Sequence, residues 1–159
     1  MLYATARSVR EERSKQRCAL QDFSRVRVSL VKGKVGWRVG SVEIEQNDFA
    51  LAEDREVRTS VTIVYRLLRR FIKGEEVHVG LYDFVIDALD ELLKSQSNRR
   101  LVELFVQVRI LSLLGYVDEK VIPKPLQTCV IGQVLDFADE VSLPALEQIV
   151  KHALEISHL

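Results

Sequence analysis

The sequence predicts an α+β fold in which a basic, β-rich region, residues 1–48, precedes an all-α helical domain, residues 54–159. Apolar and polar residues alternate between residues 25 and 39, which is typical of half-buried strands. After residue 54 the apolar residues recur every three or four positions, as on amphipathic helices. Charge changes near the same boundary: residues 1–45 carry ten Lys/Arg and five Asp/Glu, whereas the whole chain is neutral.

The β-rich region is expected to hold a short strand at residues 2–6 and a hairpin. The hairpin strands are Arg25–Leu30 and Val35–Val39, joined by a turn at Lys32-Gly33-Lys34. By the two-residue period, one face turns toward a core, with the residues Val26, Val28, Leu30, Val35, Trp37 and Val39. The other face presents cations, Arg25, Arg27, Lys34 and Arg38. Trp37 could stack on a nucleic-acid base, but its phase favours the core.

The helical domain is expected to contain four long helices and one short one. The long helices cover residues 55–73, 79–94, 99–114 and 142–156, and the short one covers residues 131–139. Apolar residues surround the third helix, so it should lie at the centre of a bundle. Glycines end the first and third helices, at Gly74 and Gly115. Residues 121–125 contain two prolines and are expected to be a non-helical connector. Ser142 is expected to cap the last helix, with Pro144 in its first turn.

The loop after the first strand is strongly cationic. It carries five Lys/Arg within eleven positions: Arg7, Arg10, Arg13, Lys15 and Arg17. Such a loop favours binding of a polyanion such as the phosphate backbone of nucleic acid. The alternative is a solvated loop of mixed charge, since Glu11 and Glu12 lie inside it.

Catalysis is not expected. The sequence has no glycine-rich phosphate loop, and its three histidines lie in no recognisable catalytic motif. The carboxylates Asp83, Asp87, Asp90 and Glu91 are better explained as the solvated face of a helix than as a two-metal nuclease site. Cys18 and Cys129 lack further ligands at zinc spacing, so we expect two reduced thiols, no metal and no cofactor. We see no secretion signal and no apolar run of about 18 residues, so we expect a cytoplasmic protein without a membrane span.

The order of a basic loop, a Leu-Gln-x-Phe block, an amphipathic hairpin and a helical bundle resembles the RecO family of bacterial recombination mediators. The matching residues are Ala6-Arg7, Ser14, the block Ala19–Phe23, Arg109 and the segment Leu113–Tyr116. The resemblance runs in order over nearly the whole chain.

The resemblance implies an amino-terminal OB-fold and a nucleoid-associated role in DNA repair and homologous recombination. RecO proteins bind single- and double-stranded DNA and anneal complementary strands. With a RecR-type partner, they help recombinase replace single-stranded-DNA-binding protein on gapped DNA. They also bind the acidic, apolar C-terminal tail of that protein through the helical domain.

Carried onto this chain, the resemblance implies two sets of site residues. The DNA-binding set comprises Arg7, Arg10, Arg13, Lys15, Arg17, Arg25, Arg27, Lys34 and Arg38. The candidates for the acidic tail are Arg99, Arg100 and Arg109, and for the first two of these the alternative is ordinary helix-surface charge.

The chain departs from the family pattern in three ways. A five-stranded OB barrel would begin here at its third strand, so the barrel is expected to be partial, either shortened or incomplete. The four-cysteine zinc module of many members is replaced by a connector with Cys129 alone, which again predicts no metal. Val106 and Gln107 stand where the family has an aromatic and an acidic residue. The alternative function is therefore a protein-interaction adaptor, whose helical domain binds an acidic tail while the chain has little affinity for DNA.

Overall fold

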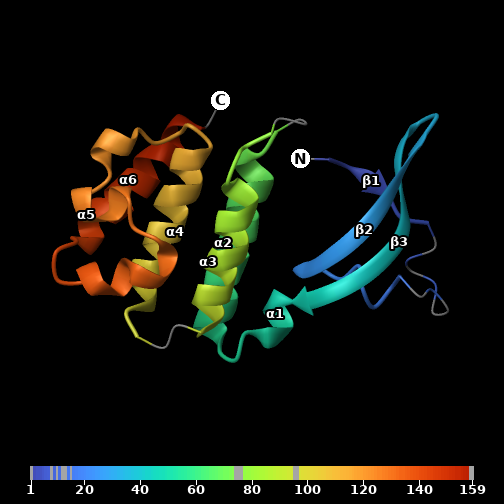
Figure 1. The fold of residues 1–159 in the computed structure, drawn as a ribbon, viewed down its shortest axis with the longest axis horizontal. Helices are drawn as coiled ribbons and strands as arrows, with labels where there is room; N and C mark the ends of the chain where they lie inside the picture. Colours follow the sequence, from blue (N-terminus) through green and yellow to red (C-terminus); the bar gives the residue numbers. More distant parts are fainter. Residues whose placement is uncertain are drawn as a thin grey trace.

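A computed structural model describes residues 2–7, 9, 11, 14, 16–73, 77–94 and 97–157. The fold is mixed α+β: a three-stranded sheet precedes several helices. Figure 1 shows the sheet at one end of the molecule, the helices at the other and a short helix between them. This arrangement follows the change of sequence period near residue 50.

The sheet consists of β1 (Ala4–Thr5), β2 (Ser24–Gly33) and β3 (Gly36–Asn47), in the order β1-β3-β2. β2 and β3 are antiparallel, which confirms the hairpin, and β1 runs parallel to β3. Both hairpin strands are longer than predicted. Gly33 pairs with Gly36, and Gly36 has a φ of 128°, so the turn is at Lys34-Val35. The prediction that Val35 faces the core is therefore wrong, because this side chain is 95% exposed at the turn.

Two register shifts bend the hairpin. One lies between Arg25 and Val26 and the other between Val28 and Leu30, and at each of them β3 has one residue more than β2. Extra residues of this kind bend a strand and increase its twist, and both strands curve together in Figure 1. The apolar face of the hairpin is only partly covered, since Val28 and Leu30 are each 37% exposed. The expected core on this face is thus incomplete.

The four long helices are confirmed to within a few residues at each end. They are α2 (Arg55–Phe71), α3 (Leu81–Lys94), α4 (Arg99–Leu113) and α6 (Leu143–Ile156). All residues from 101 to 108 are buried, so α4 is the central helix, as predicted. Gly115, with a φ of 79°, follows the end of α4. Gly74 lies outside the described residues.

The segment between α4 and α6 is more helical than predicted. It contains a 3₁₀ turn η1 (Glu119–Val121), a one-turn helix α5 (Lys124–Gln127) and a 3₁₀ helix η2 (Ile131–Phe137). The prediction that residues 121–125 are non-helical is wrong at both ends. Val121 lies in η1, and Lys124 and Pro125 lie in the first turn of α5, where no helical N–H is needed. Ser142 is the N-cap residue of α6, but its side chain makes no capping hydrogen bond.

The sheet and the helices meet at Asp48, the first residue of the short helix α1 (Asp48–Leu51). This carboxylate is fully buried and accepts hydrogen bonds from Arg25 Nε (2.9 Å), Gln46 Nε2 (2.8 Å) and the Tyr65 hydroxyl (2.6 Å). These donors lie on β2, β3 and α2. Asp48 therefore joins the hairpin to the helices at the end of the sheet.

Candidate nucleic-acid interface

The second half of the basic loop is bound to the hairpin. The Gln16 side chain donates a 2.7 Å hydrogen bond to the carbonyl of Gly40 on β3, and Ala19 is buried. Arg7 and Arg17 are exposed. The other three predicted loop cations, Arg10, Arg13 and Lys15, lie outside the described residues. The loop thus presents at least two of its five cations to solvent beside the sheet.

Arg25 does not lie on an exposed cationic face, and this expectation is wrong. Besides its bond to Asp48, one terminal nitrogen lies 2.8 Å from Asp48 Oδ1 and 2.7 Å from Asp90 Oδ1 on α3, and the side chain is 10% exposed. Burial acts to lower the pKa of Arg25, but the bonds to Asp48 and Asp90 outweigh it and raise the pKa above its usual value. Because two carboxylates from the helical part pair with its charge, Arg25 links the sheet to the helices.

The other hairpin cations differ in the contacts that their charged groups make. Arg27 forms an exposed ion pair with Glu45, at 3.1 Å. Lys34 is exposed at the turn, and Arg38 is exposed on β3, beside Gly33. The structure adds Lys32, whose ammonium lies 5.7 Å from the ring centroid of Trp37. The sequence predicts Lys32 to lie in the turn, whereas continuing the two-residue alternation past Leu30 places it on the same face as Trp37, with which it pairs.

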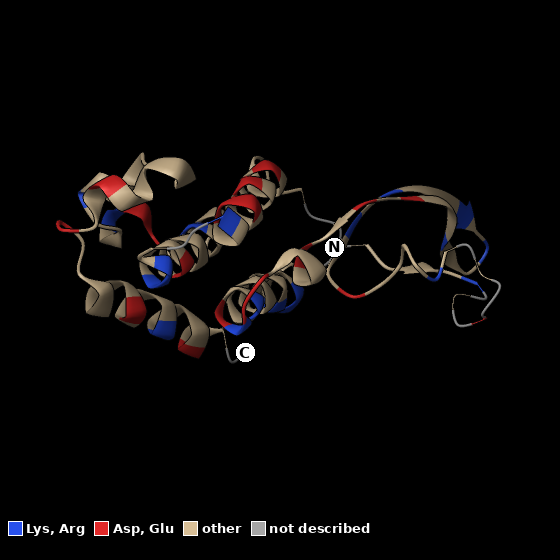
Figure 2. Ribbon diagram, turned by 90° about the horizontal axis from the view of Figure 1, so that it is seen from below, with Lys and Arg blue, Asp and Glu red and all other residues tan. Residues whose placement is uncertain are grey.

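We call Lys32, Lys34, Trp37 and Arg38 the hairpin-tip patch. Residues 28–42 contain these three cations and no Asp or Glu. Figure 2 shows the cationic segments at the end of the hairpin that is farthest from the helices. Trp37 is partly buried and lies outside the main core, with a lysine over its ring. Lys32 and Trp37 pair across the two strands and share one face of the hairpin, whereas Arg38, the next residue of β3, lies on the opposite face beside Gly33. The tip therefore presents positive charge on both faces and an aromatic ring on one of them; surfaces that bind single strands also combine cations with aromatic rings.

The three arginines predicted to bind an acidic tail do not share one surface. Arg99 pairs with Asp54 and Glu56 at the start of α2. Arg100 pairs with Glu147 on α6, at 2.7 Å, and with Glu103. Arg109 donates to the carbonyl of Gln127 and lies 3.5 Å from Glu119. At about 100° per residue, positions 99, 100 and 109 point in three directions around α4.

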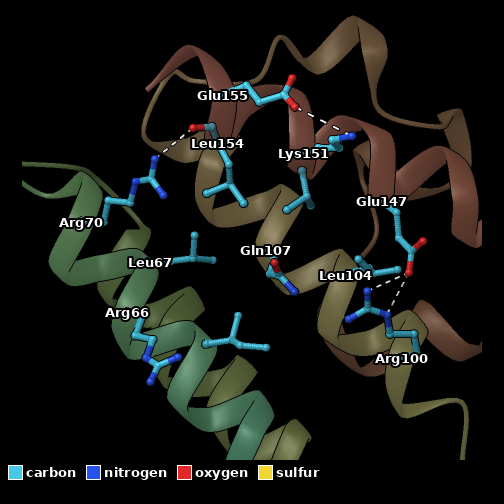
Figure 3. A pocket seen from close by; sticks show the side chains of 12 residues that line it. Arg66, Leu67, Arg70, Arg100, Leu104, Gln107, Glu147, Lys151, Leu154 and Glu155 are labelled. Carbon is cyan, nitrogen blue, oxygen red and sulfur yellow. Dashed lines mark hydrogen bonds and ion pairs between the residues drawn. The ribbon is translucent and has the colours of Figure 1, made fainter. Parts of the chain in front are cut away.

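A groove of about 600 Å³ lies between α2, α4 and α6, and we call it the α2–α6 groove. Its apolar lining residues are Ile63, Leu67, Leu104, Val150 and Leu154. Four cations, Arg66, Arg70, Arg100 and Lys151, line it together with Glu147 and Glu155 on α6 (Figure 3). Arg70 donates to the carbonyl of Leu154 across the groove, at 2.9 Å. Of the three predicted tail-binding arginines, only Arg100 belongs to this groove.

The two thiols differ in their surroundings. Cys18 is exposed in the basic loop, and Cys129 is buried. Burial, followed by the negative charge of Asp136, raises the pKa of Cys129 above its usual value. Among the described residues no group of three His, Cys, Asp or Glu side chains is arranged to hold a metal ion.

Within the described part of the chain, no helix combines the length and the apolar character that a membrane span needs. The sequence matches no model of a known protein family, and a search of curated proteins gives no match.

Proposed function

We propose that this chain is a non-enzymatic DNA-binding protein of the RecO type. It binds single- and double-stranded DNA through its β-rich region, anneals complementary strands and helps load recombinase onto DNA coated by single-stranded-DNA-binding protein. The observation that carries the proposal is the hairpin-tip patch, where three cations flank the turn, one of them over Trp37, and residues 28–42 contain no Asp or Glu. Arg7 and Arg17 add exposed charge from the loop beside it.

The strand order supports assignment of the sheet to part of an OB barrel. In a five-stranded OB barrel the third and fifth strands pair in parallel, and the fourth and fifth form an antiparallel hairpin. β1, β2 and β3 pair in this manner, with β1 parallel to β3 and β2 antiparallel to it. The partial cover of the apolar hairpin face also agrees with a barrel that has fewer than five strands here.

Annealing follows from the same charges. Two complementary strands repel each other through their phosphates, and a surface that neutralises both of them lowers this repulsion. Such binding depends mainly on phosphate contacts, so it is steeply sensitive to salt and shows little sequence preference.

The test is fluorescence anisotropy with a labelled single strand of about 30 nucleotides, longer than the ~4–16 nucleotides that one OB-fold covers. We expect the wild-type affinity to fall linearly with salt on logarithmic axes. Replacing Lys32, Lys34 and Arg38 by Ala should reduce the slope by roughly 2, since each contact to a single strand contributes about 0.7. The matched control replaces three exposed lysines of the helical region by Ala: Lys94, Lys120 and Lys124.

A folded wild-type chain that does not bind at low salt would refute DNA binding. A slope that changes equally in the control and in the hairpin-tip variant would show that overall charge, rather than this patch, determines the affinity.

The α2–α6 groove favours a second function, that of an adaptor for an acidic, apolar peptide tail. Its apolar lining can receive hydrophobic side chains, and Arg66 and Lys151 can attract carboxylates, since the exposed pair of Lys151 with Glu155 is long, at 3.9 Å. Arg100 is less available, because Glu103 and Glu147 already pair with it. We therefore expect Lys151→Ala to weaken binding of a labelled acidic peptide that ends in apolar residues. Lys124→Ala, which removes a lysine outside the groove, is the control; equal affinities of the two variants would exclude the groove.

A further inference from the structure

One face of α2 carries a row of cations that the proposed function does not use. Residues 55–73 contain six Lys/Arg and one acid, Glu56. Arg58, Thr62, Arg66 and Arg69 follow one another at steps of three or four residues, so they share one face of the helix. From Arg58 to Arg69 this face extends roughly 16 Å at 1.5 Å per residue. It is as long as about five nucleotides of a stacked strand, which rises ~3.4 Å per phosphate along its axis.

Among the residues that the structure describes, none of these cations pairs with an acid. Within the described residues, the side chains of Arg66 and Arg69 make no hydrogen bond or ion pair. Arg58 only lies against an aromatic ring, with its guanidinium 5.5 Å from the centroid of Phe49. Arg70, one position from Arg69, is by contrast held by the carbonyl of Leu154 and by Ser157. The row therefore keeps its charge for an external anion.

A hollow of about 500 Å³ lies alongside the row, between α2 and the residues that flank β1 and β2. Aromatic side chains line it, Tyr3, Phe23 and Tyr65, together with Thr62, Leu68, Asp22, Arg66 and Arg69. Phe23 stacks on Phe49, with the ring centroids 5.2 Å apart, so the aromatic surface reaches the ring that carries Arg58. Tyr3 is 79% exposed and is the lining ring most open to an incoming ligand.

We propose that this face of α2 is a second binding surface for single-stranded nucleic acid. Arg58, Arg66 and Arg69 hold the phosphates, and a base enters the hollow and stacks on Tyr3. A row of cations with no acid on the same face matches a chain of regularly spaced phosphates. The aromatic hollow matches an unstacked base, which a duplex does not offer. The inference rests on the proposed function for the class of ligand, but it assigns a surface on the helices, apart from the hairpin-tip patch.

The test compares two variants in the same anisotropy experiment with the labelled single strand. The first replaces Arg58, Arg66 and Arg69 by Ala, which favours helix and should preserve the fold, as circular dichroism can check. We expect its salt slope to fall by roughly 2 relative to wild type. The second variant is Tyr3→Ala, for which we expect about tenfold weaker binding with an unchanged salt slope. The control is again the Ala variant at Lys94, Lys120 and Lys124.

The outcomes separate this inference from the proposed function. If the hairpin-tip variant binds more weakly and the α2 variant matches wild type, the inference is overturned and the proposed function stands. If only the α2 and Tyr3 variants bind more weakly, the inference holds and the hairpin-tip patch is not the site. No binding by the wild-type chain overturns both. An α2 variant that weakens duplex and single-strand binding equally, with no effect of Tyr3→Ala, overturns the assignment to single strands.

Discussion

Arg25 and Arg27 lie two positions apart in β2, and their surroundings differ. Arg25 is 10% exposed and contacts Asp48 and Asp90, whereas Arg27 is 76% exposed and contacts only Glu45 within the described residues. A buried charge that loses its partner is costly, but an exposed ion pair contributes little. Arg25 therefore contributes more than Arg27 to the free energy of unfolding.

We expect Arg25→Ala to lower the free energy of unfolding by about 3–5 kcal/mol, because it leaves the buried Asp48 carboxylate without its counter-charge. Arg27→Ala should lower it by less than about 1 kcal/mol. Urea denaturation followed by circular dichroism measures both. Similar losses for the two variants would contradict the role of Arg25 at the junction.

The sequence could not predict the position of Arg25. The two-residue period grouped Arg25 with Arg27 on an outward face, but it says nothing of Asp48 and Asp90, which the fold brings to the base of the hairpin. Arg99, Arg100 and Arg109 show the same limit: their carboxylate partners come from α2, α6 and η1. Which cations remain free is decided by these tertiary contacts, and so the local pattern found Lys34 and Arg38 but also selected Arg25.

At the scale of elements, α2 begins with a charged cap. The Asp54 carboxylate accepts a 2.8 Å hydrogen bond from the backbone N–H of Val57. This bond is the main cause that lowers the pKa of Asp54; partial burial opposes it, and the positive charge of Arg99 adds to it. A carboxylate whose pKa is lower in the folded state stabilises the fold above its unfolded pKa, about 3.9, and loses this effect as pH falls through the folded value.

We expect Asp54→Asn to lower the thermal midpoint at neutral pH, since the amide can cap the helix but lacks the charge. The difference from wild type should begin to shrink below about pH 4, where the carboxylate of the unfolded chain becomes protonated, and it should be lost once the pH passes the lowered pKa of the folded state. Thermal melts across this pH range measure it, with Glu53→Gln as a neighbouring control. A difference that is constant with pH would show that the charge of Asp54 does not stabilise the helix.

The long helices were predictable because their apolar residues repeat over several turns, and α4 stood out because apolar residues lie nearly all round it. Short elements were less predictable. Nothing in the local pattern marks the register shifts that lengthen β3, and a single turn such as α5 has too few residues to show a period. Pro125 also led to a wrong prediction, that of a non-helical connector, because the effect of a proline on a helix depends on the turn it occupies.

At the scale of the whole molecule, Arg66 lies on a ridge between two hollows. It lines the α2–α6 groove on one side and the aromatic hollow beside β1 on the other. A peptide tail in the groove and a nucleic-acid strand along α2 would both use its charge. We expect the two ligands to weaken each other's binding, by the same factor in both directions. Titration of the labelled strand with and without the acidic peptide measures this factor, and Arg66→Ala should bring it close to one.

The exposed Cys18 follows Arg17 directly in the basic loop, whereas Cys129 is buried and its raised pKa keeps it in the unreactive thiol form at neutral pH. The folded chain should therefore react with one equivalent of a maleimide dye, and with a second only after unfolding. A dye at Cys18 would act as a natural spectroscopic reporter at the loop, installed without mutation. It would follow the approach of a strand to the loop in real time.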